Sequence, residues 1–299
     1  MKDEILISIL VPVYNQEKYI AKCLNSLIDQ TFVFKYQILI LDDGSTDNTP
    51  KILKRYSRFG SFIKVFHKEN EKSIAKARNY LLDKVDTKYF VFVDSDDIVS
   101  PYYLEDLYAA LRKDNSDISC CGYVMVKQFS NNPNLRGYIQ LNRKDALHEM
   151  ILGTRGQYIL WNKLIKTELV KDIRFYNLSY GEDFCFIFDV MQKNVKVAFI
   201  QNRLYFYRFF VNRIKKERVD DKKKSYLNKM IEMEKDKKYS HDKALLSSWI
   251  YVTASYFWII SNSESSYRKF LLDAMRKRRK IYYSQNASIP KKFLKMIFG

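Results

Sequence analysis

The chain is poor in the residues that make turns, disordered segments and cross-links. Its 299 residues include only 8 Gly, 5 Pro, 4 Cys and 3 His. Fibrous and disordered chains lack large apolar side chains, whereas this chain has 23 Tyr and 20 Phe, so we expect a globular protein. The length exceeds that of most single domains, which predicts one large domain with an accessory segment.

The few cysteines show no metal-site spacing. They are Cys23, Cys120, Cys121 and Cys185, and two of them are adjacent in an apolar run, as buried free thiols usually are. A reducing cytosol fits this pattern best. At the N-terminus, charged residues and Pro12 interrupt the apolar residues, so we expect a cytoplasmic protein without a secretory signal peptide.

Glycine-rich phosphate loops are also missing from the sequence. Neither G-x-G-x-x-G nor G-x-x-x-x-G-K-[ST] occurs, which disfavours Rossmann-type cofactors and P-loop nucleotides. His67, His148 and His241 belong to no motif, and we expect structural roles for them.

The net charge of +18 is concentrated near the C-terminus. Residues 1–212 contain 30 Lys and Arg against 25 Asp and Glu, or +5, whereas residues 213–299 contain 22 against 9, or +13. An anionic partner is therefore expected for the C-terminal segment, either phospholipid headgroups or nucleic acid.

Two stretches of this segment have a helical character. Residues 244–261 carry no charge and form either a membrane span or, because Ser and Thr dilute the stretch, a buried or interfacial helix. The basic run 276–280, with the apolar residues 270–271 before it and 281–282 after it, predicts a basic amphipathic helix.

Short apolar runs alternate with helical patterns through the first 126 residues. Strands are predicted at 5–11, 38–41, 62–66, 89–93 and 118–126, and helices at 19–28, from 47, at 74–82 and at 101–111. This alternation predicts a doubly wound α/β domain with a parallel sheet. Later units are a helix at 184–191, strands at 195–200 and 204–210, and helices after 212.

Polar motifs follow three of the predicted strands, at residues 12–15, 42–45 and 94–97. Each motif alone is explained as well by a turn or a helix cap. Together they would meet in one crevice, because ligands bind beyond the carboxyl ends of parallel strands. Clustered carboxylates repel one another unless a cation lies between them, and Mg²⁺ and Mn²⁺ bind one or two carboxylates together with water and substrate phosphates. The pattern therefore indicates a diphosphate-bearing substrate.

The chain resembles family 2 glycosyltransferases of the GT-A (nucleotide-diphospho-sugar transferase) fold. The resemblance covers roughly the first 210 residues, in the segments SILVPVYNQEKYIAKCLNSLIDQT, ILDDGSTDNT, AKARN, FVFVDSDD, LWNKLIKTEL and YGEDFCF. It implies a mostly parallel sheet flanked by helices, with a helical C-terminal extension. The catalytic domain would be 1–212, with a nucleotide-binding half at about 1–126 and an acceptor half at about 127–212; the basic segment 213–299 would associate with the membrane.

The resemblance also implies an activity. An inverting enzyme would move a hexosyl or N-acetylhexosaminyl group from a UDP-sugar to a glycan or lipid-linked acceptor. The product would be capsule, exopolysaccharide or another cell-surface polysaccharide, made at the inner face of the cell membrane, where basic residues are attracted to anionic lipid. A homo-oligomer is compatible with the sequence.

Donor contacts are assigned by the same resemblance. Base and nucleoside contacts fall to Pro12, Tyr14 and Asp43. Asp96 is expected to bind Mn²⁺ or Mg²⁺, and Asp94 is expected beside the ribose and sugar and as a second metal ligand.

Two arginines belong to the same expected site. Arg78 would pair with Asp94 or with phosphate, and a surface salt bridge is the alternative. Arg208 would contact the diphosphate, because Phe206 stands where some relatives have a metal-ligating histidine. Ser73 and Leu81 stand where the family frequently has glycine, so the donor loop departs from the family pattern at these two positions.

Two later motifs are expected to form the part of the site that binds the acceptor. Asp183 is the expected catalytic base, with Glu182 as the alternative: one carboxylate takes the proton of the acceptor hydroxyl while its oxygen attacks C1 opposite the leaving diphosphate. The other interpretation is a cap on the helix that follows, and one residue can serve both purposes. Residues 161–163 shape the acceptor side or, for Trp161, the core.

Two other functions are weighed against this one. A nucleic-acid-binding protein that uses the basic segment would leave the strand-end carboxylates unexplained, so we expect no nucleic acid partner. A sugar-phosphate nucleotidyltransferase would share the fold type and the metal, but its glycine-rich basic signature is missing at residues 11–15.

Overall fold

A computed structural model of the chain describes residues 4–113, 115–126, 138–152, 158–208, 221–260 and 265–285. The chain forms two compact units. The first comprises Met1–Asn177 and Phe186–Phe210, and the second comprises Leu178–Cys185 and Val211–Gly299. Helix α6 (Glu182–Met191) begins in the second unit and continues into the first.

The first unit is built on one sheet, in which the described residues form nine strands. They are β1 (Ile7–Val13), β2 (Tyr36–Asp43), β3 (Ile63–Lys68), β4 (Tyr89–Phe92), β5 (Ile98–Val99), β6 (Ile118–Val126), β7 (Tyr138–Leu141), β8 (Lys163–Lys166) and β9 (Val197–Arg208). The helices are α1 (Ile20–Ile28), α2 (Thr49–Tyr56), α3 (Ile74–Leu82), α4 (Tyr103–Lys113), α5 (Arg143–Leu152) and the 3₁₀ helix η1 (Thr167–Val170).

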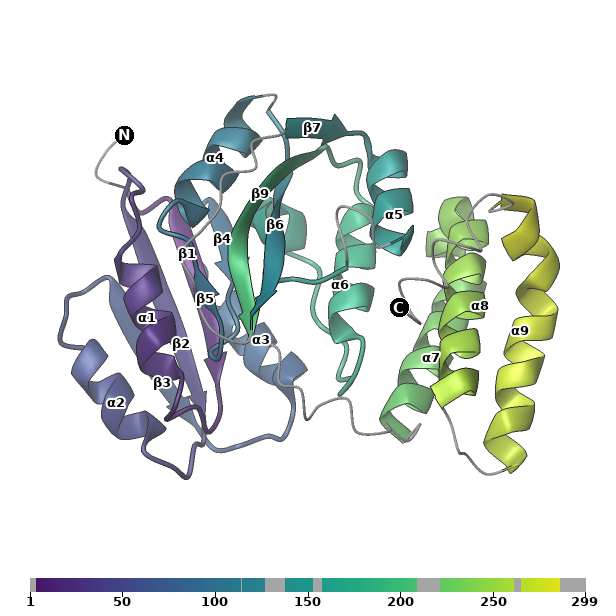
Figure 1. The fold of residues 1–299 in the computed structure, drawn as a ribbon, viewed down its shortest axis with the longest axis horizontal. Helices are drawn as coiled ribbons and strands as arrows, with labels where there is room; N and C mark the ends of the chain where they lie inside the picture. Colours follow the sequence, from purple (N-terminus) through teal and green to yellow (C-terminus); the bar gives the residue numbers. More distant parts are fainter. Residues whose placement is uncertain are drawn as a thin grey trace. The chain divides into compact units, whose positions relative to one another are not determined.

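The N-terminal part of the sheet is parallel, as the sequence predicts. Strand β1 pairs with both β2 and β4, and β2 pairs with β3, all in parallel. The order is therefore β3-β2-β1-β4. Because the chain reverses its direction of travel across the sheet after β3, right-handed connections place α1 and α2 on one face and α3 on the other (Figure 1).

Alternation along the strands gives the sheet two apolar faces. Ile7, Ile9 and Val11 of β1 share a fully buried core with the apolar face of α1, including Leu24. Leu10 lies between them in sequence and is equally buried on the opposite face. Burial on both faces explains why this strand has an almost continuous apolar sequence.

Beyond β4 the sheet is mixed, and here the sequence predictions were incomplete. Strand β8 pairs antiparallel with both β4 and β6, and the short β5, β7 and α5 were not predicted. In place of the two strands predicted at 195–200 and 204–210, residues 197–208 form one strand, β9, which continues through the polar residues 201–203; residues 209–210 lie outside the described residues. A bulge in the pairing of β9 with β6, beside Gly122, accommodates these polar residues. The two backbones approach closely there, since a Cβ at Gly122 would lie only 3.1 Å from the Gln201 carbonyl oxygen.

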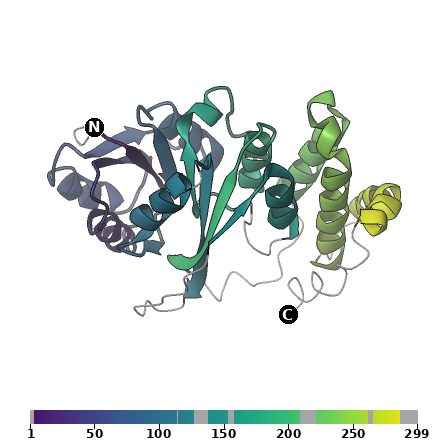
Figure 2. The same ribbon diagram turned by 90° about the horizontal axis from the view of Figure 1, so that it is seen from above.

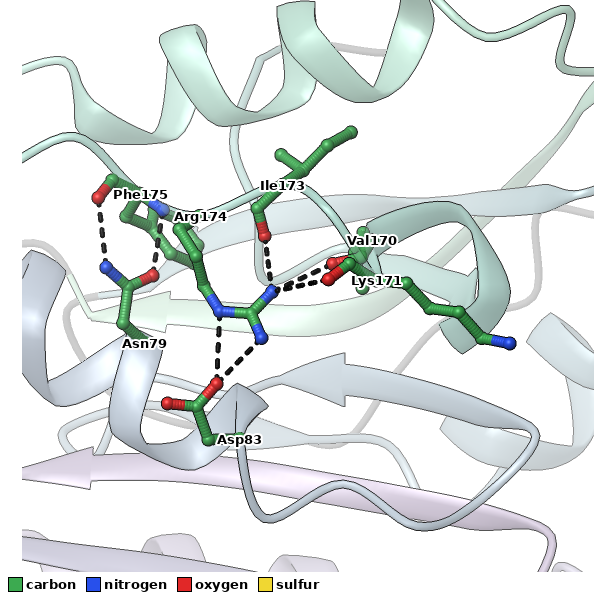
Figure 3. Close-up of polar contacts among 7 residues, drawn as sticks. All are labelled: Asn79, Asp83, Val170, Lys171, Ile173, Arg174 and Phe175. Carbon is green, nitrogen blue, oxygen red and sulfur yellow. Dashed lines mark hydrogen bonds and ion pairs between the residues drawn. The ribbon is translucent and has the colours of Figure 1, made fainter.

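Helix α3 is fixed to the segment that follows η1 (Figure 3). The Asn79 side chain accepts a hydrogen bond from the Phe175 amide at 2.8 Å and donates one to its carbonyl at 3.0 Å. Arg174 pairs with Asp83 and also donates to the carbonyl oxygens of the preceding turn, including that of Val170. These contacts hold the helix that carries Arg78.

The second unit is helical. It contains α7 (Asp221–Lys235), the 3₁₀ helix η3 (Lys237–Asp242), α8 (Lys243–Ile260) and α9 (Ser265–Gln285). Helix α8 packs against α7 and α9, and Figure 2 shows α9 nearly end-on beside α8. A buried ion pair joins Arg278 of α9 to Glu234 of α7, and Ser247 of α8 donates to the same carboxylate.

The two helical stretches predicted near the C-terminus correspond to α8 and α9. Within the described part of the chain, no helix combines the length and the apolar character needed to cross a membrane. The apolar face of α9, with Leu271, Ala274 and Tyr282, is buried. It is therefore occupied within the protein.

Candidate functional site

The three polar motifs follow adjacent parallel strands, as predicted. Residues 12–15 end β1, 42–45 end β2, and 94–97 follow β4. All three lie at the carboxyl edge of the sheet, where open α/β sheets bind ligands. Pro12 is buried inside β1, whereas the Tyr14 side chain just beyond the strand is 47% exposed.

The first two motifs are linked to each other by hydrogen bonds. The Asn15 amide donates to Ser45 Oγ at 2.9 Å, and Asn15 Oδ1 accepts from the Thr46 amide at 2.8 Å. Glu17 Oε2 accepts from the backbone amide of Asn48 at 3.0 Å. Asn15 and Ser45 therefore shape the loops together with the neighbouring Glu17 and Thr46, and Tyr14 and Asp43 are the candidates for ligand contact.

The two neighbouring carboxylates at the end of β2 differ in their surroundings. Asp42 accepts from the Ser45 amide at 3.0 Å and pairs with His67 Nδ1 at 3.1 Å. Burial raises the pKa of Asp43, whereas the Glu71 amide, at 3.5 Å, lowers it. Asp42 thus holds the turn, and His67 pairs with it.

The acidic turn at residues 94–97 is bonded to β9. The Tyr205 hydroxyl accepts from the Asp94 amide at 3.1 Å and donates to Asp97 Oδ2 at 2.8 Å. The Arg208 amide donates to Asp97 Oδ1 at 2.7 Å, and Arg208 Nε donates to the Asp96 carbonyl oxygen at 2.8 Å. Both carboxylate oxygens of Asp97 are therefore bonded to β9.

The turn concentrates negative charge. Burial, followed by the charge of Asp94, raises the pKa of Asp97 to about 8. Among the described residues, no three His, Cys, Asp or Glu side chains converge as a complete metal cluster. The hard oxygen donors Asp94 and Asp96 nevertheless fit Mg²⁺ or Mn²⁺, which bind one or two carboxylates and take their other ligands from water and phosphates.

A thiol lies beside the turn but does not change its preference for a hard cation. Cys23 Sγ lies 3.7 Å from the Asp94 carbonyl oxygen. Burial and then the nearby carboxylates raise the pKa of this thiol well above its ordinary value. Because the thiolate is the form that ligates metals, the neutral thiol is a poor competitor for the ion.

Two arginines accompany the acidic turn. Arg78 Nη2 lies 3.6 Å from Asp94 Oδ1, and its guanidinium lies 5.6 Å from the centre of the Phe175 ring. The Arg78 side chain is only 6% exposed, so the alternative of a surface salt bridge is wrong. The Arg208 guanidinium lies 4.4 Å from the centre of the Tyr19 ring.

Trp161 belongs to the core behind the turn. It is 6% exposed and stacks on Tyr205 at 4.1 Å between ring centroids, with Tyr207 stacked at 5.5 Å. Asn162 and Lys163 are also buried and bond to each other. Core packing, the second interpretation of Trp161, is the one that these contacts support.

Comparison with known proteins identifies the family. The model of "Glycosyl transferase family 2" matches residues 8–191. The chain belongs to this family.

Relatives of this glycosyltransferase occur in several bacteria. The glycosyltransferase GlyG of Streptococcus pneumoniae is 30% identical over 217 residues, which are 68% of this chain and 70% of GlyG. The poly(ribitol-phosphate) beta-N-acetylglucosaminyltransferase TarS of Staphylococcus aureus is 32% identical over 67% of this chain, but the match spans only 35% of TarS.

Solved structures show the same fold. TarS residues 1–349, crystallised in complex with UDP-GlcNAc, superimpose with a TM-score of 0.58 at 22% identity, over 94% of this chain and 73% of that one. The mixed sheet with helices on both faces is thus the GT-A fold that the sequence predicted.

The residues of the expected glycosyltransferase site are divided between the two units. Asp94, Asp96 and the two arginines lie in one unit, around the acidic turn. Glu182 and Asp183 lie in the second unit, where they are the first two residues of α6, after Gly181 with a φ of +73°.

One residue at the turn was not found from the sequence. Tyr205 lies in the run 204–208, for which the resemblance makes a prediction only at Phe206 and Arg208, because some relatives have histidine at position 206. Tyr205 and Asp97 are 108 residues apart, and only the pairing of β9 with β5 and β6 brings them together. The sequence does contain a local signal for Tyr205, which stands two residues before Tyr207 in an apolar strand.

Proposed function

We propose that this glycosyltransferase moves a sugar, with inversion, from a UDP-sugar to a glycan or lipid-linked acceptor in the synthesis of a cell-surface polysaccharide. The single observation that carries the proposal is the acidic turn at the carboxyl edge of the parallel strands, with Arg78 and Arg208 beside it. A pyrophosphate-bound cation fits this combination of carboxylates and guanidinium groups. The relatives GlyG and TarS support the class of reaction.

Each donor contact has a proposed residue. Tyr14 and Asp43, with Pro12 behind them, would receive the uracil and ribose; Asp43 accepts hydrogen bonds, as the N–H of a nucleobase requires. Asp96, with Asp94, would hold Mn²⁺ or Mg²⁺. The ion would neutralise the charge that develops on the leaving diphosphate.

Arg208 would contact the same diphosphate. Its guanidinium is held from two sides, by the Asp96 carbonyl oxygen at 2.8 Å and by the face of Tyr19. A planar donor group that is already oriented loses little freedom when it binds a phosphate. This arrangement supports Arg208 as a substitute for the histidine that position 206 lacks.

Asp183 is the proposed base, with Glu182 as the alternative. In the inverting reaction the carboxylate removes the proton of the acceptor hydroxyl while that oxygen forms a bond to C1 and the bond from C1 to the diphosphate breaks. The carboxylate is thereby protonated, and the diphosphate leaves with the bonding electrons.

The proposed location is the cytoplasmic face of the membrane, where the protein would be peripheral. Support comes from α9, on which Arg268, Lys269, Arg276, Lys277, Arg279 and Lys280 are exposed. Each Lys or Arg close to an anionic leaflet contributes about 1 kcal/mol of attraction. A lipid-linked acceptor would be encountered at the same surface.

The metal site can be tested with Asp96→Asn. A panel of UDP-sugars with Mn²⁺ first identifies the donor by its slow hydrolysis, and the variant is then assayed with that donor. Turnover should fall by about 10²–10³-fold, because charge stabilisation of the leaving group is lost, while the circular dichroism spectrum is unchanged.

A matched control is Asp172→Asn, which neutralises a carboxylate that is 72% exposed and pairs with Lys193. It should keep wild-type turnover. If Asp96→Asn also kept it, the metal assignment would be wrong. If every UDP-sugar were inert while GDP-sugars were hydrolysed, the donor proposal would be wrong.

A further inference from the structure

Tyr205 binds the acidic turn at both of its ends. Its hydroxyl oxygen accepts a hydrogen bond from the backbone amide of Asp94, the first residue of the turn. The same hydroxyl group donates a hydrogen bond to the carboxylate of Asp97, the last residue of the turn. Asp96 lies between these two anchored positions. One hydroxyl group therefore fixes the backbone that carries the proposed metal ligands.

The tyrosine is itself held rigidly. Its side chain is completely buried, its ring stacks on Trp161 with an interplanar angle of 21°, and the Tyr103 ring lies 6.2 Å away. Such packing leaves an aromatic side chain few alternative rotamers. The hydroxyl position is thus determined by the core and not by solvent.

The geometry also gives Asp97 a structural role in the turn. Asp97 is bonded through Oδ2 to Tyr205 and through Oδ1 to the Arg208 amide, and it is 1% exposed. Asp96 bonds to β9 through its backbone carbonyl. The bonds to β9 thus engage both carboxylate oxygens of Asp97 and also the backbone of Asp96.

We propose that Tyr205 is a positioning residue for the donor site: together with Asp97 it holds residues 94–96 in the conformation that binds the metal and the diphosphate. The inference rests on the proposed function, because it assumes that the ion binds at Asp96. Groups that orient the ligands of a metal ion contribute about 10–100-fold to the affinity for the metal.

Tyr205→Phe tests this role, because it removes the hydroxyl and keeps the ring stacked on Trp161. Tyr103→Phe is the matched control: it also removes one hydroxyl from a completely buried ring, but that hydroxyl donates to the Trp161 carbonyl oxygen at 2.6 Å and not to the turn. Mn²⁺ affinity is measured by titration calorimetry in the presence of UDP, and the melting temperature is measured alongside.

Both variants should lose similar amounts of thermal stability, since each loses buried hydrogen bonding. Only Tyr205→Phe should bind Mn²⁺ about 10–100-fold more weakly. In the transfer assay its KM for Mn²⁺ should rise by a similar factor, with kcat approaching the wild-type value at saturating Mn²⁺. If Tyr205→Phe does not fold, Asp97→Asn, which keeps the size of the side chain, should show the same weakened binding.

Wild-type Mn²⁺ affinity in Tyr205→Phe would overturn the inference, as would equal weakening in both tyrosine variants. Failure of the proposed function has a different signature. In that case the wild-type protein would bind no Mn²⁺ with UDP, or Asp96→Asn would bind it as well as the wild type does.

Discussion

At the scale of single residues, the site shows how position divides work between identical side chains. Asp42 is bonded to its own turn and to His67, which leaves Asp43 as the candidate for the nucleobase. The turn between them and the next element requires Gly44, because its φ is +71° and a Cβ there would lie 2.6 Å from the Asn70 amide nitrogen. The sequence D-D-G therefore encodes one structural acid, one candidate ligand and one glycine required by geometry.

The same question of division arises for Glu182 and Asp183, and a substitution can answer it. Asp183→Asn should reduce transfer to the acceptor by about 10²–10⁴-fold, the usual contribution of a positioned base. Donor hydrolysis and Mn²⁺-dependent UDP binding should survive. The effect on folding should stay below about 1 kcal/mol, since an acidic residue in the first turn of a helix stabilises it only modestly.

Glu182→Gln is the matched partner, because it neutralises the neighbouring residue of the same first turn. Near-normal transfer by Asp183→Asn together with loss in Glu182→Gln would move the base to Glu182. Loss of donor binding in Asp183→Asn would mean that the residue supports the structure and is not the base.

At the scale of elements, the local signals predicted the helices of the first 113 residues well but missed α5, and they predicted the long-range pairings poorly. Helix 74–82 was predicted from the spacing of its apolar residues, and it forms from Ile74 to Leu82. Strand β8 was not predicted as a partner of β4, because the residues that choose a neighbouring strand lie far apart in sequence. The acidic turn was predicted in the same way as the helix, from local sequence, whereas its anchor Tyr205 depends on that distant pairing.

The start of α6 gives a prediction for an element. Gly181 has a φ of +73°, and a Cβ added there would overlap the ring of Tyr226. Gly181→Ala should therefore destabilise the protein by about 2–4 kcal/mol, from overpacking and from the left-handed backbone conformation. Denaturant unfolding followed by tryptophan fluorescence is a suitable measurement, since Trp249 donates a hydrogen bond to the Tyr226 hydroxyl at 2.9 Å.

A double-mutant cycle with Tyr226→Leu separates the two causes. The smaller side chain relieves the overlap but not the backbone strain, so the double variant should be more stable than the sum of the single effects predicts. Simple additivity would show that the ring does not oppose the new methyl group.

At the scale of the whole molecule, much of the excess positive charge of the C-terminal segment lies on one helix, α9. The apolar side of α9 is buried, and Arg278 on that side is paired with Glu234. Its six other basic residues are exposed, and Asp273, paired with Lys277, is the acidic residue among them. A helix whose apolar side is already covered would bind a membrane through charge and not by inserting.

Removing residues 265–299 would uncover the apolar side of α8 as well as removing charge, so neutralisation is the sharper test. A variant with Arg276, Lys277, Arg279 and Lys280 replaced by Gln should bind vesicles containing phosphatidylglycerol more than about tenfold more weakly, since each charge contributes about 1 kcal/mol. Wild-type binding should weaken at high salt, where the Debye length falls to about 3 Å.

The matched control replaces Lys222, Lys224, Lys237 and Lys238, which are exposed in the same unit, and should bind nearly as the wild type does. Equal loss in both variants would reveal a response to net charge alone, and preference for oligonucleotides over vesicles would favour nucleic acid as the partner of α9.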